Sequence, residues 1–195
     1  LMWRLQMYGG ATSDQPWEEV CEIAAPATTR AGVAFRDAHA ALAFAGGGDY
    51  ERMEEMINRL ITAAEGGDSF TREFVLPLVQ GIDAFSQAQY AESVRLMEPV
   101  FPQLIRMGGS HAQREVFEDT MLEAYIRAEE FEKAELMLRS RLQQRESVRD
   151  SFWLGRVQVE QGQTSQAKAN FHRAKLAWEV SGSANPELAN LNALI

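Results

Sequence analysis

Cysteine and long hydrophobic runs are scarce in this chain of 195 residues. Its one cysteine, Cys21, cannot form an internal disulfide or a four-cysteine zinc site, and such a sequence suits a reducing compartment. No apolar stretch approaches the roughly 20 residues that are needed to cross a bilayer. We therefore expect a cytoplasmic protein without membrane insertion, in which Cys21 is a small, buried apolar side chain.

Sequence motifs of catalysis are also missing. The chain contains no Gly-x-Ser-x-Gly elbow, no phosphate-binding loop ending in Lys-Ser or Lys-Thr, no His-Glu-x-x-His pair and no dinucleotide fingerprint. The run Gly46-Gly47-Gly48 lacks the lysine and the preceding strand of a phosphate-binding loop, so we interpret it as a turn between helices. We therefore predict no cofactor, no metal ion and no catalytic residue.

The charge balance is acidic. The net charge is -9, from 28 acidic and 19 basic residues, and the resulting field repels phosphate backbones. Nucleic acid is therefore not an expected partner. Hydrophobic residues make up 46% of the chain, which is enough to bury a core and is unlike the composition of a disordered protein.

What the sequence does contain is a helical pattern. The stretches between glycines and prolines are rich in Ala, Leu, Met, Glu, Arg and Gln, which favour helices. Ser110 is followed three residues later by Gln113, which predicts a capping box, and Asp68 or Ser69 is expected to cap the helix that runs through Thr71. The fold class that we predict is all-α.

Four segments repeat one pattern around an anchor position, occupied by Met53, Ser93, Ala134 and Ala167. The residues three before the anchors are Tyr50, Tyr90, Phe131 and Thr164. The residues four after the anchors are Ile57, Met97, Leu138 and Phe171, and those twelve before are Ala41, Gly81, Leu122 and Gly155. Small residues let two antiparallel helices approach, and an aromatic residue is expected to fill the wedge at the turn. The spacings of 40, 41 and 33 residues indicate degenerate repeats.

This pattern resembles the tetratricopeptide repeat, whose period is about 34 residues. The resemblance implies a right-handed superhelix, or α-solenoid, of antiparallel helix pairs that forms a single helical-repeat domain over residues 1–195. We expect repeat units at about 1–30, 33–65, 69–107, 110–146 and 147–181, followed by a capping helix at 185–195.

A closer resemblance is carried by the segment Met107-Gly108-Gly109-Ser110-His111-Ala112-Gln113-Arg114-Glu115-Val116-Phe117. Together with Phe35-Arg36-Asp37-Ala38-His39-Ala40 and Trp3-Arg4-Leu5, this segment is similar to the tetratricopeptide repeat protein 38 family. Members of that family are considerably longer, so the resemblance implies that this chain is a C-terminal fragment. The family brings no well-established biochemical activity.

The repeat resemblance implies that the first helix of each pair lines a concave groove. The residues expected there are Phe35, Leu42, Ile82 and Phe85 in the apolar part, and Asp119, Glu123, Arg149 and Arg156 in the charged part. Our first functional hypothesis is a scaffold that binds a protein partner, as a peptide or helix, in this groove. The apolar part is expected to be exposed unless missing N-terminal repeats cover it.

Two alternatives remain open. The polar residues Asp37, His39, His111, Gln113 and Arg114 can converge on a small-molecule or enzymatic pocket. Alternatively, His111 supports the helix cap while Arg114 pairs with neighbouring acidic residues or with the next repeat. The third hypothesis is a structural cap or dimerisation module of a longer solenoid, which would make the protein a homo-oligomer.

Overall fold

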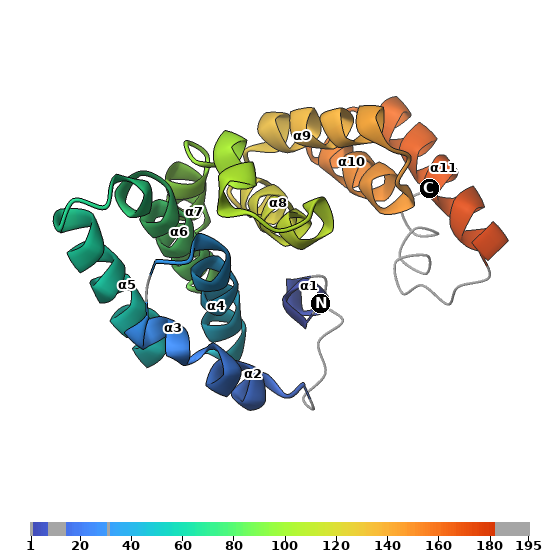
Figure 1. Cartoon of the computed structure of the whole chain (residues 1–195). Helices are drawn as coiled ribbons and strands as arrows, with labels where there is room; N and C mark the ends of the chain where they lie inside the picture. Colours follow the sequence, from blue (N-terminus) through green and yellow to red (C-terminus); the bar gives the residue numbers. More distant parts are fainter. Residues whose placement is uncertain (1, 8–14, 31, 182–195) are drawn as a thin grey trace. The chain divides into compact units, whose positions relative to one another are not determined.

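The computed structural model describes residues 2–7, 15–30 and 32–181, and all regular secondary structure in these ranges is helical (Figure 1). The predicted all-α class is therefore confirmed. The elements are α1 (Met2–Met7), α2 (Trp17–Ala24), α3 (Pro26–Thr29), α4 (Ala34–Gly47), α5 (Tyr50–Glu65), a π-helical turn η1 (Thr71–Val75), α6 (Leu76–Ser86), α7 (Tyr90–Met97), a 3-10 helix η2 (Phe101–Met107), α8 (His111–Arg127), α9 (Phe131–Gln144), α10 (Val148–Glu160) and α11 (Thr164–Ser181). The capping helix expected at 185–195 lies outside the described residues.

The chain forms two compact units, Leu1–Ala124 and Tyr125–Ile195. The boundary between them falls inside α8, because Ala124 and Tyr125 are consecutive residues of this helix. The expectation that residues 1–195 form a single domain stays a prediction.

The same turn joins four consecutive helix pairs, α4 to α5, α6 to α7, α8 to α9 and α10 to α11. Its central residue has a left-handed backbone in Gly48 (φ 68°), Ala88 (φ 59°), Glu129 (φ 61°) and Gly162 (φ 74°). The next backbone N–H donates to a carbonyl of the preceding helix, in the pairs Asp49 to Phe44, Gln89 to Ala84, Glu130 to Tyr125 and Gln163 to Gln158. This is the Schellman arrangement of a helix C-terminus. Each left-handed residue lies five positions before an anchor, so the repeat alignment and the turn coincide.

Small residues at the repeat positions allow close packing of the paired helices. A Cβ on Gly155 would lie 2.6 Å from Cε1 of Phe171, and a Cβ on Gly81 would overlap Cγ of Met97. The four anchors are buried, with exposed fractions of 0 to 1%. The expected aromatic wedge is wrong for Tyr50, because this residue is 52% exposed and so does not fill the space at the turn.

In the first unit, α2 packs directly on two glycines at the end of α4. A Cβ on Gly46 would overlap the Trp17 ring, and a Cβ on Gly47 would lie 2.5 Å from Sγ of Cys21. The Cys21 side chain is buried, as predicted. Burial raises the pKa of the Cys21 thiol, and the negative charge of Asp49 raises it further, which disfavours a reactive thiolate.

Both predicted helix caps are confirmed. Ser110 N–H donates to Oε1 of Gln113 over 2.8 Å, and Gln113 N–H donates to Oγ of Ser110 over 3.3 Å. Asp68 is the other cap, since Thr71 N–H donates to its Oδ1 over 3.0 Å. Hydrogen bonds from the Thr71 backbone and side chain lower the pKa of Asp68.

Candidate functional site

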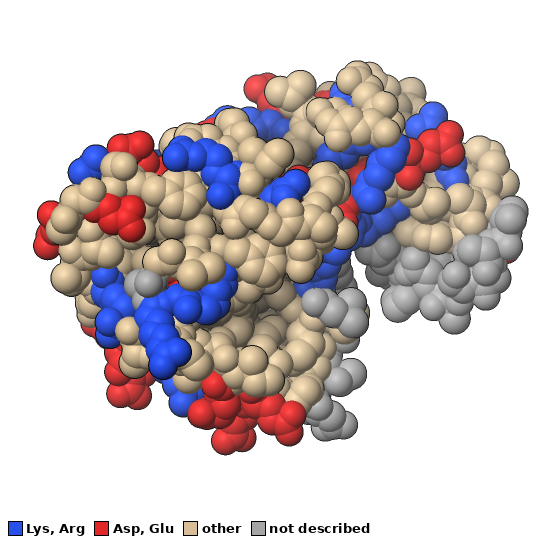
Figure 2. Space-filling view, in the orientation of Figure 1, with Lys and Arg blue, Asp and Glu red and all other residues tan. Residues whose placement is uncertain are grey.

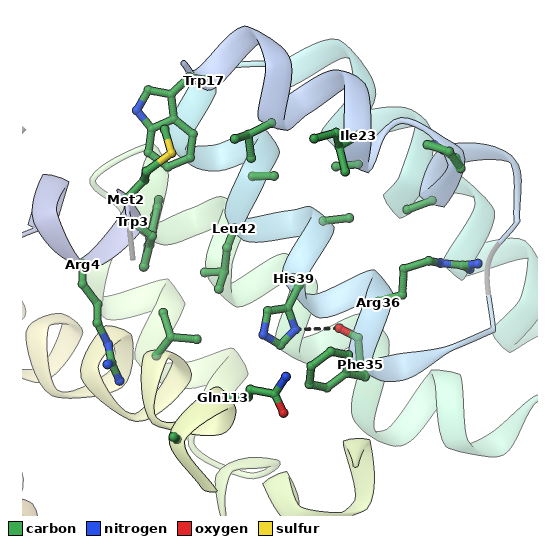
Figure 3. Close-up of a pocket in the computed structure, with 18 residues that line it drawn as sticks. Met2, Trp3, Arg4, Trp17, Ile23, Phe35, Arg36, His39, Leu42 and Gln113 are labelled. Atoms are coloured by element: carbon green, nitrogen blue, oxygen red, sulfur yellow. Dashed lines mark hydrogen bonds between the residues drawn. The ribbon is translucent and has the colours of Figure 1, made fainter. Parts of the chain in front are cut away.

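A cavity of about 810 Å³ opens within the Leu1–Ala124 unit. One side is formed by α4, and the other walls come from α1, from α2 with the start of α3, and from the first turns of α8 (Figure 3). We call it the α4 cavity. Its volume is within the range of about 300–1,000 Å³ that is usual for ligand pockets.

Small and apolar side chains create the space. Ala40 and Ala43 line it from α4, Ala24 and Ile23 line it from α2, and Ala112 lines it from α8. The Ile23 side chain is 81% exposed, so the cavity has an apolar group exposed to solvent. In the space-filling view, the hollow over α4 is surrounded mainly by uncharged side chains, with acidic side chains gathered beside it over α2 (Figure 2). Glu18, Glu19 and Glu22 of α2 are exposed.

His39, Gln113 and Phe35 form a cluster at one end of the cavity. The ring centroids of His39 and Phe35 are 4.2 Å apart, and His39 meets Phe117 edge-on with centroids 5.1 Å apart. A Cβ on Gly109 would overlap the Phe35 ring and lie 3.3 Å from Oε1 of Gln113. The segments that carry the family resemblance, 35–40 and 107–117, therefore meet in space.

The cavity is lined by two formally charged residues, Arg4 and Arg36, and by no Asp or Glu among the described residues. Both arginines are already paired. Nη2 of Arg36 lies 3.0 Å from Oδ1 of Asp37, and Nε of Arg4 lies 2.8 Å from Oδ2 of Asp119. The lining therefore offers no unbalanced charge to a ligand.

Asp37 does not line the cavity but holds the chain that precedes α4. Its Oδ2 accepts hydrogen bonds from the N–H groups of Gly32, over 2.9 Å, and Val33, over 3.2 Å. The carboxyl is fully buried. These contacts explain Asp37 as a structural residue at the start of α4.

The structure also separates His111 and Arg114 from the cavity lining. His111 is on the surface, with its Nε2 3.9 Å from Oε1 of Glu118. The Arg114 guanidinium donates to the carbonyls of Gly108 and Gly109. Arg114 therefore binds the turn before α8, and of the residues expected to form the pocket only His39 and Gln113 line the cavity.

The expectation of an exposed apolar groove is wrong for most of its residues. Ile82 is 0% exposed, Leu42 is 6% exposed and Phe85 is 7% exposed. Part of the covering comes from α1, because the Trp3 ring lies 5.7 Å from the Phe85 ring and its Nε1 donates to Oγ1 of Thr120 over 2.9 Å. Leu42 and Phe35 do line the cavity.

The charged residues expected in the groove have partners or are buried. Asp119 is fully buried beside Arg4, and Glu123 is buried, with an exposed fraction of 6%. In the second unit, the Arg156 guanidinium lies 4.6 Å above the Trp153 ring, and Nε of Arg149 lies 3.6 Å from Oδ1 of Asp150. None of these four residues lines the α4 cavity.

Sequence reasoning missed the α2 wall of the cavity. Trp17, Val20 and Ala24 line it, and their spacing of three and four residues is that of one apolar helix face. That periodicity was available in the sequence. It could not show that this face lines a cavity together with α1 and α8, because α2 and α8 are far apart along the chain.

No protein-family model matches the chain, and no solved structure matches it. Among the described residues, no helix is long and apolar enough to cross a membrane. The part of the chain that the structure describes also contains no group of three His, Cys, Asp or Glu side chains arranged to hold a metal ion.

Proposed function

We propose that this chain is a protein-interaction module that binds an apolar segment of a partner protein in the α4 cavity. The observation that carries the proposal is the cavity itself, which is apolar, open to solvent and built from two first helices of the repeat pairs, α4 and α8. Buried aromatic and aliphatic anchors provide most of the affinity of such interfaces. The absence of catalytic motifs from the sequence favours binding over catalysis.

The proposal includes a tetratricopeptide-type stack of helix pairs, related to the tetratricopeptide repeat protein 38 family. Its support is the fourfold recurrence of one turn at the positions where the sequence repeats align. In such stacks, the first helices of successive pairs present one continuous surface to a peptide or helix.

Charge favours a basic partner segment around the apolar anchor. Exposed acidic groups of α2 lie beside the cavity; Glu22 is paired with Arg52, which leaves Glu18 and Glu19. The whole chain has a net charge of -9. Complementary charges speed association and fix orientation more than they raise affinity. Association with the partner is therefore expected to slow as the salt concentration rises.

The test is selection from a random-peptide display library, followed by competition on a blocked variant. Ala112 lines the cavity and is exposed, so Ala112→Trp narrows the cavity without disturbing the core. Ala91→Trp is the matched control, because Ala91 is an exposed alanine of α7 in the same unit that does not line the cavity. We expect the selected peptides to share an apolar anchor and to bind the control but not the blocked variant. Selected peptides that bind both variants equally would exclude the cavity as the site.

A small-molecule receptor is the second candidate. It is favoured by the meeting of His39 and Gln113 at one cavity of ligand size. The peptide selection distinguishes the two candidates. A small-molecule receptor would bind small apolar molecules, but no peptide would be enriched in the selection. The dimerisation hypothesis stays a prediction.

A further inference from the structure

We propose that the α4 cavity recognises a primary carboxamide next to an apolar side chain, that is, an asparagine or glutamine side chain of the partner segment. In this arrangement, Nε2 of His39 accepts a hydrogen bond from the amide N–H, and Nε2 of Gln113 donates one to the amide carbonyl. The inference rests on the proposed function, since it names the chemistry of the partner at the same cavity.

The His39 tautomer follows from the hydrogen bond that its Nδ1 makes with the backbone. Nδ1 of His39 lies 2.7 Å from the carbonyl oxygen of Phe35, and a carbonyl oxygen can only accept. Nδ1 therefore carries the proton in the neutral ring, and Nε2 presents a lone pair. The tilted contact with the Phe35 ring and the edge contact with Phe117 hold the plane of the imidazole.

The amide orientation of Gln113 follows in the same way. Its Oε1 accepts the Ser110 N–H over 2.8 Å, so Oε1 is directed at the helix cap and Nε2 is directed away from it. Figure 3 shows the amide nitrogen of Gln113 turned towards the Phe35 and His39 rings. One end of an apolar cavity therefore presents an acceptor and a donor together.

This pair matches an amide better than it matches either ion. A carboxylate has no N–H for the His39 lone pair, and Arg4 and Arg36 are already neutralised by Asp119 and Asp37. An ammonium group would find no Asp or Glu among the described lining residues. Burying an ion without a counter-charge costs far more than burying an amide that makes both hydrogen bonds.

The test uses one phenylalkyl skeleton with three end groups, namely 4-phenylbutanamide, 4-phenylbutanoate and protonated 4-phenylbutylamine. Binding is followed by the NMR shifts of the Trp3 and Trp17 indole N–H groups, since both rings line the cavity. We expect the amide to bind about tenfold more tightly than either ion, the difference that two net hydrogen bonds supply.

Gln113→Glu is the diagnostic variant. A glutamate keeps an oxygen for the Ser110 N–H and so preserves the capping box, but it replaces the donor with a negative charge. We expect the amide preference to disappear and the ammonium compound to become the tightest ligand. Gln144→Glu adds the same charge at an exposed position of the other unit and is expected to change nothing. His39→Phe keeps the ring contacts but lacks the hydrogen-bond acceptor. We expect this variant to lose the preference for the amide without gaining a preference for the ammonium compound.

Two results would overturn the inference. One is tightest binding of the butanoate to the natural chain, which would show that the arginines decide the chemistry. The other is an unchanged order of affinities in Gln113→Glu when its thermal unfolding matches that of the natural chain. In either case, peptides selected as above that still fail to bind Ala112→Trp would leave the proposed function standing. Loss of both peptide and amide binding would remove both proposals.

Discussion

Because the turn that joins the helix pairs is left-handed, we expect the same substitution, alanine to glycine, to change the stability in opposite directions at two nearby sites. Ala88 has φ 59° at the centre of a turn, whereas Ala91 belongs to the right-handed helix α7. Both residues are exposed, so removal of either methyl group sacrifices little packing. We expect Ala88→Gly to stabilise the Leu1–Ala124 unit and Ala91→Gly to destabilise it.

The magnitude follows from the backbone alone. The left-handed conformation costs a residue with a Cβ about 1–2 kcal/mol in the folded state. Glycine avoids this cost, but it loses about 0.5–1 kcal/mol more conformational entropy on folding. The net gain in the free energy of unfolding for Ala88→Gly is therefore about 0.5–1 kcal/mol. For Ala91→Gly, the helix propensity of glycine predicts a loss of about 0.5–1 kcal/mol.

The assay is urea unfolding followed by circular dichroism, with the midpoint and slope fitted separately. Gly48→Ala supplies the reverse test, because a Cβ at Gly48 would meet no atom within 4 Å, and only its φ of 68° resists the change. We expect this variant to lose about 0.5–1 kcal/mol, the reverse of the change expected for Ala88→Gly. If Ala88→Gly lowered the stability as Ala91→Gly does, residue 88 would not be left-handed in solution and the common turn would be refuted.

Three further predictions concern packing, pH and the thiol. Gly155→Ala places a Cβ 2.6 Å from the Phe171 ring, so we expect a loss of about 1–3 kcal/mol in urea unfolding, whereas an unchanged midpoint would refute the close approach of α10 and α11. The pKa of Asp68 is lowered in the folded chain, so its capping contribution is fully present above the unfolded-state pKa and is lost as the pH falls through the folded-state pKa. In Asp68→Asn, we therefore expect the free energy of unfolding to fall less steeply as the pH is lowered. Because burial raises the pKa of Cys21, we expect slow reaction with a thiol reagent at neutral pH and fast reaction after unfolding, and equal rates would contradict the packing of α2 on Gly47.

Much of the local structure could be predicted from the sequence, because its causes are local. The Ser110 and Gln113 cap, the helix class and the registration of the repeats all depend on residues a few positions apart. The left-handed turn is a partial case. Gly48 and Gly162 signal it, but Ala88 and Glu129 occupy the same position without the residue type that usually indicates it.

The candidate site was only half predictable, because its chemistry depends on side chains brought together from distant segments. The sequence singled out Phe35, His39 and Gln113, and it also singled out Asp37 and Arg114, which have the same polar character. Only the packing showed that Asp37 binds the chain before α4 and that Arg114 binds the carbonyls before α8.

By itself, the sequence determined the helices, their caps and the repeat positions at which small residues permit close approach. The tertiary structure decided which apolar faces are covered and which remain open. Ile82 and Ile23 are both apolar residues of helices, yet one is 0% exposed and the other is 81% exposed. The difference arises because burial is set by whichever distant segment packs against a face, and the residues of the face itself carry no information about that segment.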